Sequence, residues 1–123
     1  MAKLAEPDLT IWGTVIPNLG WSNIAREIWL DAKLNPNVPA FSVVLACSTS
    51  MTASFAAAGM LGGGLNLILV GGSEVMSRPS LALTAEASKR LTDLFAQDPA
   101  AALAALGALT PQDYVLPTKG WAN

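Results

Sequence analysis

Cys47, the only cysteine in 123 residues, is the residue of this sequence best suited to covalent chemistry. It follows the strand-forming run "FSVVLA" and precedes "STSMTAS", where small residues begin an expected helix. Cysteine reacts as the thiolate, and the free N–H groups at a helix start stabilise that anion. Its small neighbours leave room for a substrate. The alternative is a structural cysteine, buried as a small hydrophobic residue.

The sequence lacks the usual partners of a reactive thiol. Histidine is absent from all 123 residues, so neither a cysteine–histidine pair nor a Ser–His–Asp triad can be assembled from this chain alone. A single cysteine also excludes an internal disulfide and a cysteine-rich metal site. We therefore expect no metal, and a base for the thiol must come from elsewhere.

Composition excludes several classes of partner. Hydrophobic residues make up 52% of the chain and charged residues only 13%, against about 25% charged in soluble domains. Either much of the chain is buried, or part of its surface is meant for a partner. The net charge of −2 indicates neither nucleic acid nor an anionic membrane surface as a partner. A lone thiol fits a reducing compartment, and we expect a cytoplasmic location.

The stretch 34–73 carries no charge, but it does not predict a membrane span. It opens with "NPNVP", contains "CSTSMTAS" and breaks at the glycines 62–64. A bilayer-spanning helix needs about 20 consecutive apolar residues, which no part of this stretch supplies. Burial of strands and helices on both faces explains the missing charges better.

Alternating strands and helices must position the residues around Cys47. The pattern predicts strands at 8–16, 40–46 and 65–72 and helices at 22–34 and 48–61. We expect Ser22 to cap the first helix, and the continuously apolar third strand to be central. The glycines 62–64 stop the second helix; they lack the lysine of a phosphate-binding loop. This order of elements predicts a parallel, right-handed α/β layer.

The composition changes near Pro79, where buried, glycine-rich sequence gives way to charged helices. Helices are predicted at 84–97 and 99–109, and the proline-bounded end, 110–123, is expected to be irregular. We place a boundary here, between a core layer of residues 1–79 and an appended region of residues 80–123.

Two motifs, in this order, resemble those of the thiolases, the acetyl-CoA acyltransferases. In that family a strand runs into a nucleophilic cysteine within a C-x-S/T-S/G motif, and the next strand ends in "GG-x-E-x-MS". Here "CSTS" contains Cys47, and "GGSEVMS" supplies Gly71, Gly72, Glu74, Met76 and Ser77. Upstream, Asn23, Ala25 and Arg26 are similar to the family's "N-x-A-R" segment. The "CSTS" form looks like the trifunctional-enzyme type of thiolase, and less like the "CGSG" form of the motif.

The resemblance implies a thiolase-type α/β layer with parallel strands and a buried helix, incomplete relative to the family. Residues 1–79 would be part of the N-terminal core, and residues 80–123 the start of the family's loop region. Cys47 would be the nucleophile that attacks an acyl-CoA or acetyl-CoA thioester and holds the acyl group. Coenzyme A is then part of the substrate, and no separate cofactor is expected. The implied setting is fatty acid metabolism.

The resemblance also implies that catalytic groups are missing. The family takes its activating histidine, a second cysteine and an asparagine from a second half that this sequence does not contain. We expect the chain alone to be nearly inactive, and to need a complementing C-terminal chain or a homo-oligomer. The run "FSVVLA" would then be an open edge strand. The alternatives are a non-catalytic thiolase-like binding or assembly subunit, and part of a biosynthetic condensing enzyme.

Three charged residues have two interpretations each. Glu74 is either a general base or, as its apolar surroundings favour, a structural carboxylate that holds its loop near Cys47 by hydrogen bonds. Lys89 and Arg90 either contact the phosphates of coenzyme A or form the solvated face of an amphipathic helix, which is the commoner case.

Overall fold

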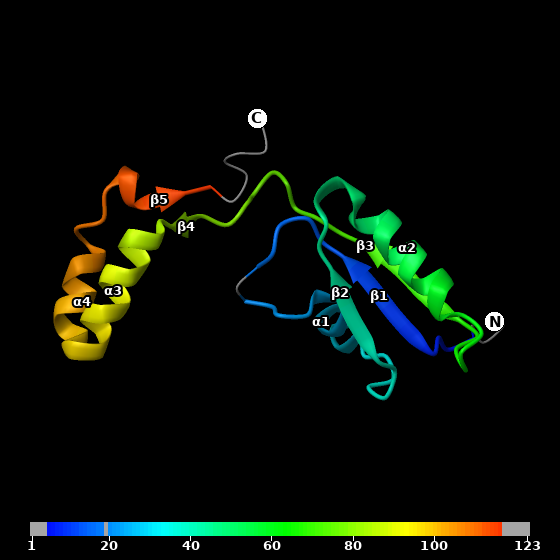
Figure 1. Ribbon diagram of the computed structural model, residues 1–123. Helices are drawn as coiled ribbons and strands as arrows, with labels where there is room; N and C mark the ends of the chain where they lie inside the picture. The colour runs from blue at the N-terminus through cyan, green and yellow to red at the C-terminus, as the bar shows by residue number, and fades with distance from the viewer. Residues whose placement is uncertain (1–4, 19, 117–123) are drawn as a thin grey trace. The chain divides into compact units, whose positions relative to one another are not determined.

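The computed structural model describes residues 5–18 and 20–116, and their contacts divide into two compact units between Val75 and Met76. The first unit contains β1 (Leu9–Gly13), α1 (Ile24–Asp31), β2 (Ala40–Val43), the 3-10 turn η1 (Ala46–Ser48), α2 (Thr49–Met60) and β3 (Ile68–Gly72) (Figure 1). The second contains β4 (Ala82–Leu83), α3 (Ala85–Gln97), α4 (Pro99–Leu106), η2 (Pro111–Asp113) and β5 (Tyr114–Val115). The assignment of residues 80–123 to a thiolase loop region stays a prediction.

The first unit is a parallel sheet of three strands in the order β2-β1-β3. Thr10 of β1 lies opposite Ala40 of β2 and Leu69 of β3. The predicted parallel α/β layer is confirmed, and the run that contains β2 forms an edge strand as expected. The prediction that the third strand is central is wrong, because β1 holds that place. An apolar run does not distinguish a central strand from an edge strand here, since Leu69 of β3 is apolar and yet 43% exposed.

The core of this unit forms where α2 meets the sheet. Leu9 and Ile11 of β1 pack against Ala53 and Ala57 of α2, and Ile11 is fully buried. Alanines let the helix axis approach the sheet closely. Helix α1 packs on β1 and β2, on the opposite side of the sheet from α2 (Figure 1). No described residue of the first unit covers the outer face of α2, and Phe55 there is 70% exposed.

Asn23 caps helix α1, which corrects the expectation that Ser22 caps it. The Asn23 Oδ1 accepts from the Arg26 amide at 3.3 Å and from the Ser42 hydroxyl at 2.9 Å. Its Nδ2 donates to the Ala40 carbonyl oxygen at 2.8 Å. Two of these three partners lie on β2, so tertiary contacts select the capping residue. A serine side chain has no amide that could also reach the strand.

The other matched residues of the upstream segment are structural as well. Ala25 is 1% exposed, and its amide donates to the Ser42 hydroxyl at 3.0 Å. The Arg26 guanidinium donates to the carbonyl oxygens of Val38 at 3.0 Å and Pro36 at 2.8 Å. The "N-x-A-R" segment therefore fastens α1 to β2 and to the connection that precedes it.

Glycine stops α2 as predicted. The helix ends at Met60, and the connection to β3 contains Gly62 at φ +88° and Gly64 at φ +96°. Residues with a Cβ atom rarely adopt this left-handed conformation, so glycine is needed at both places. The sharp reversal returns the chain to the sheet for β3.

The second unit is a helical hairpin with a small ladder. Helices α3 and α4 pack on each other and bury Ala87, Leu91 and Ala102. Strands β4 and β5 are antiparallel. Both helices were predicted; the end expected to be irregular contains η2 and β5, and residues 117–123 lie outside the described residues. Along 5–18 and 20–116, no helix has both the length and the apolarity needed to cross a bilayer.

Candidate active site

A hollow of about 310 Å³ lies in the first unit, at the edge where the three parallel strands end. It is lined by residues 13–15 at the end of β1, by Ala46, Cys47, Thr49 and Ser50 around the start of α2, and by residues 72–74 at the end of β3. Open α/β sheets bind ligands at the carboxyl ends of their strands, and ligand pockets measure about 300–1,000 Å³. The hollow therefore has the place and the size of a ligand site.

Cys47 lies in the turn η1, two residues before α2 begins, and is one of the residues that line the hollow. The residue is exposed. The expected junction of strand and helix is present, and the alternative of a small buried cysteine does not hold for this chain. Solvent therefore reaches this residue without any movement of the core.

The backbone beside Cys47 has an unusual conformation. Ala46 has φ +43°, in the left-handed region that residues with a Cβ atom avoid. The Thr49 hydroxyl donates to the Ala46 carbonyl oxygen at 2.7 Å and accepts from the Leu45 amide at 2.8 Å. These bonds close the chain into a tight turn around Cys47.

Glu74 joins the ends of β1 and β3 on another side of the hollow. Its Oε2 accepts from the Thr14 hydroxyl at 2.9 Å, from the Val15 amide at 2.8 Å and from the Ile16 amide at 2.6 Å. Its Oε1 accepts from the Val75 amide at 2.7 Å. One carboxylate thus fixes two loops that are far apart in sequence.

These contacts keep Glu74 ionised. Burial raises the pKa of its carboxyl group, but the hydrogen bonds from Ile16, Val75, Thr14 and Val15 together outweigh burial, so its pKa lies below the ordinary value. A carboxylate with a lowered pKa is a weak base. The geometry therefore favours the structural interpretation of Glu74 over that of a general base for Cys47.

The glycines of the "GGSEVMS" motif make room for neighbours on β1. A Cβ atom on Gly71 would overlap the indole ring of Trp12, which lies opposite it in the sheet. On Gly72 it would crowd the Gly13 carbonyl oxygen at 3.2 Å. The Trp12 Nε1 donates to the Ser73 hydroxyl at 3.0 Å, which ties the same two strand ends once more.

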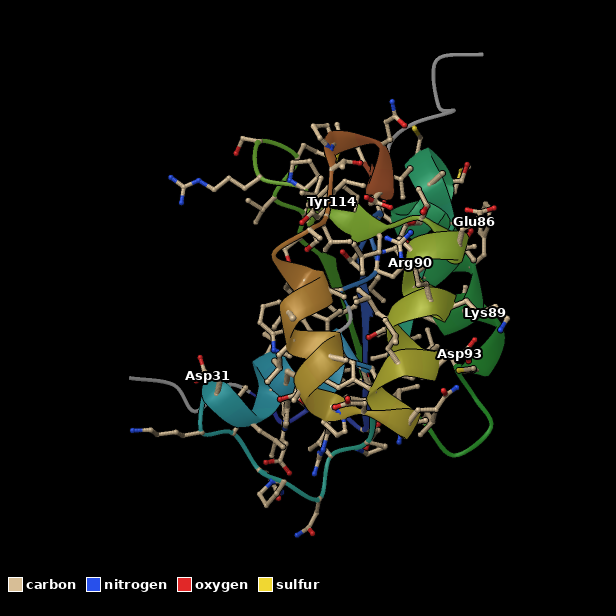
Figure 2. The ribbon with its side chains drawn as sticks, turned by 90° about the vertical axis from the view of Figure 1, so that its left-hand side faces the viewer. Asp31, Glu86, Lys89, Arg90, Asp93 and Tyr114 are labelled. Atoms are coloured by element: carbon tan, nitrogen blue, oxygen red, sulfur yellow. The ribbon has the colours of Figure 1, made fainter. Side chains whose placement is uncertain are left out.

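Lys89 and Arg90 are both engaged in ion pairs. Figure 2 shows Glu86, Lys89, Arg90 and Asp93 along α3. The Lys89 Nζ lies 2.6 Å from the Asp93 carboxylate. A terminal guanidinium nitrogen of Arg90 lies 3.0 Å from the Asp113 carboxylate. Acidic partners cancel much of the charge that a phosphate would require, so the solvated-face interpretation fits better. Over residues 5–18 and 20–116, no group of three or more acidic or cysteine side chains could hold a metal.

Sequence reasoning missed four residues at this edge of the sheet: Thr14, Thr49, Trp12 and Ser73. Thr49, inside the cysteine motif, was predicted only as one of the small neighbours that leave room for a substrate, and no role was predicted for Ser73, inside the glycine motif. Thr14 and Trp12 carry no sequence signal of their own. Their roles follow from the pairing of β1 with β3, which places Trp12 opposite Gly71.

Comparison with known proteins identifies the family. The family model for "Thiolase, N-terminal domain" matches residues 3–106, so this chain belongs to the thiolase family through that domain. The beta subunit of the mitochondrial trifunctional enzyme from Bos taurus is 35% identical over 88 residues, which are 71% of this chain and 18% of that protein. The human subunit is 34% identical over 88 residues, 71% of this chain and 19% of its own length.

A further relative carries the family's enzymatic name. A protein from Caenorhabditis elegans called "Probable 3-ketoacyl-CoA thiolase" is 45% identical over 71 residues, which are 57% of this chain and 16% of that protein. The resemblance to thiolases predicted from the two motifs, including the trifunctional-enzyme type, is confirmed. The chain spans about a fifth of the length of the curated relatives that it matches.

Proposed function

We propose that this chain is the nucleophile-bearing N-terminal part of a thiolase that transfers acyl groups between coenzyme A thioesters in fatty acid metabolism. Cys47 is the nucleophile. The observation that supports this most is the exposed Cys47 thiol in a hollow where three parallel strands end, within the match to the thiolase N-terminal domain.

The chemistry that Cys47 would perform is acyl transfer in two steps. The thiolate attacks the carbonyl carbon of an acyl-CoA or acetyl-CoA thioester, a new S–C bond forms, and the coenzyme A thiolate leaves with the electron pair of the broken bond. In the second step a coenzyme A thiol or an acetyl-CoA carbanion takes the acyl group and frees Cys47. The chain's own contribution is the sulfur and the rigid turn that presents it.

The proposal includes a partner, because the chain supplies no base. The sequence contains no histidine, and Glu74 is committed to four hydrogen bonds. We propose that a C-terminal thiolase segment completes the site, that a second copy of this chain adds an assembly contact but no base, and that the chain alone turns over very little substrate. The location in the cytoplasm stays a prediction; several relatives are named as mitochondrial.

A non-catalytic assembly subunit is the second candidate. The open face of α2 favours it, since Met51 is 55% and Phe55 is 70% exposed. Exposed apolar area of this kind marks a surface that a partner covers. Both candidates predict a partner, and only the first requires an activated thiol.

Alkylation of Cys47 by iodoacetamide at neutral pH separates the two candidates. The catalytic proposal predicts that the folded chain reacts faster than the same chain unfolded in urea, because only the folded chain holds a reagent in the hollow beside Cys47. Cys47→Ser serves as the blank for non-thiol reaction. Equal rates for the folded and the unfolded chain would refute the catalytic role and leave the assembly subunit. Acetoacetyl-CoA thiolysis by the folded chain alone should stay at background.

A further inference from the structure

The chain must turn sharply between β2 and α2, and Ala46 makes that turn in a conformation that alanine avoids. Strand β2 ends at Val43, and α2 begins at Thr49. Ala46 has φ +43°, where the Cβ atom crowds the backbone. Such a conformation persists only where the surroundings enforce it. A contact within the fold must therefore hold Ala46 in this left-handed conformation, directly before Cys47.

The Thr49 hydroxyl supplies that contact from the other side of Cys47. It donates to the Ala46 carbonyl oxygen at 2.7 Å and accepts from the Leu45 amide at 2.8 Å. The Ser48 amide adds a bond to the Leu45 carbonyl oxygen at 3.0 Å. Cys47 and Ser48 are the two residues enclosed between these anchors, so the position of the sulfur depends on them.

The γ-methyl group of Thr49 fixes the same side chain to the central strand. A Cβ atom on Gly13, the last residue of β1, would overlap this methyl group, so glycine is required there for Thr49 to fit. Thr49 is 5% exposed. A β-branched side chain has few rotamers, and the methyl contact selects the one that aims the hydroxyl at Leu45 and Ala46.

We infer that Thr49 is a positioning residue for Cys47: its methyl group seats on Gly13, and its hydroxyl holds the left-handed turn that presents the sulfur to the hollow. Thr49 acts through the backbone of Leu45 and Ala46 and takes no part in bond making. The inference deepens the proposed function, because it rests on Cys47 being the reacting group.

Two near-isosteric variants of the full chain test the hydroxyl separately from the methyl group. Thr49→Val keeps the shape and loses the hydroxyl, whereas Thr49→Ser keeps the hydroxyl and loses the methyl group. We expect Thr49→Ser to retain the Cys47 alkylation rate within about twofold, and Thr49→Val to lose about tenfold or more. The rate is followed across neutral to alkaline pH, with tryptophan fluorescence to verify folding. Equal rates for both variants would refute the inference.

A second substitution tests whether the hydroxyl acts on Ala46. Glycine adopts positive φ freely, so Ala46→Gly should need the Thr49 hydroxyl less. We expect the double variant Ala46→Gly, Thr49→Val to recover most of the rate that Thr49→Val loses. The double variant also carries less backbone strain, so it can be measured in place of Thr49→Val if that single variant does not fold. A double variant as slow as its unfolded chain would contradict the inference.

One further readout separates this inference from the proposed function. If folded wild-type protein reacts no faster than its unfolded chain, the proposed function fails. Hydrogen exchange at the Ser48 amide then still reports the turn, because that amide donates to Leu45 and not to Thr49. Faster exchange in Thr49→Val than in Thr49→Ser supports the positioning role, and equal exchange overturns it.

Discussion

The carboxylate of Glu74 accepts a hydrogen bond from the Ile16 amide at 2.6 Å across 58 positions of sequence. The same oxygen also binds the Thr14 hydroxyl and the Val15 amide. This contact joins the loops that follow β1 and β3, and both loops line the hollow beside Cys47. The shape of the candidate site therefore depends on a residue that is not expected to react.

Removal of the Glu74 carboxylate should destabilise the first unit. Glu74→Ala leaves four donors without their acceptor, and we expect a loss of about 1.5–3 kcal/mol in the free energy of unfolding. Urea unfolding followed by tryptophan fluorescence measures it, since Trp12 and Trp29 lie in this unit. Glu86→Ala, on an exposed part of α3, is the control and should change stability by less than about 0.5 kcal/mol. Equal midpoints for the two variants would contradict the prediction.

Acid should destabilise the protein through three carboxyl groups. Hydrogen bonds from the amides of Asn66 and Leu67 lower the pKa of Asp8 below its ordinary value of 3.8, and those from Thr110 do the same for Asp113. The pKa of Glu74 likewise lies below its ordinary value of 4.5. A group whose pKa is lower in the folded state stabilises the fold above its unfolded pKa, and this contribution disappears as pH falls through the folded value.

Unfolding midpoints measured from neutral pH down to about pH 3 check this sign. We expect a plateau above about pH 5 and a decline below it. In Glu74→Gln the decline of the first unit should be shallower, because glutamine does not titrate. A midpoint that rises toward low pH would contradict the assignment.

Two glycines of the first unit should respond to alanine in opposite directions. In Gly71→Ala the new methyl group overlaps the Trp12 ring, and we expect a loss of about 1–3 kcal/mol. Gly59 lies inside α2 with open space around its Cα atom, so Gly59→Ala should stabilise by about 0.5–1 kcal/mol. Thermal or urea unfolding of the pair measures both. Similar effects of the two substitutions would show that Trp12 does not occupy the space over Gly71.

Ala46→Gly should not weaken the fold, although glycine near a helix start usually does. The left-handed conformation of Ala46 costs about 1–2 kcal/mol, and glycine loses about 0.5–1 kcal/mol through its flexible unfolded state. We therefore expect a change between zero and about 1.5 kcal/mol of stabilisation. Ala57→Gly, at a helical and buried position of α2, should destabilise by about 1 kcal/mol or more. Loss of stability in Ala46→Gly comparable to that in Ala57→Gly would contradict the backbone assignment.

Local patterns were enough to predict the three strands of the first unit, the four helices and the place of Cys47 between β2 and α2, but not the short strands β4 and β5. Apolar periodicity and glycine stops act within a few residues, so they are visible in one dimension. The order of the strands is not visible in this way. Leu67 and Leu69 are as apolar as Leu9 and Ile11, and only the path of the chain leaves the former pair partly open and the latter buried.

Motifs located the candidate site but did not explain it. "GGSEVMS" marked Glu74 and Gly71, whereas their partners Ile16 and Trp12 lie in unmarked sequence. A side-chain cap such as Asn23 was misplaced by one residue because its selection depends on Ala40 and Ser42 of a distant strand. Contacts between segments far apart in sequence need the register of the sheet before they can be inferred.

The order β2-β1-β3 has a consequence for the behaviour of the isolated chain. Within the described residues, β2 and β3 each pair with a neighbour on one side only. The unpaired N–H and C=O groups of β2 and β3 point away from the sheet in opposite directions. Unpaired strand edges can bind further strands. If copies joined through unlike edges, each addition would leave a new edge exposed, so growth would continue as a filament and not stop at a closed pair.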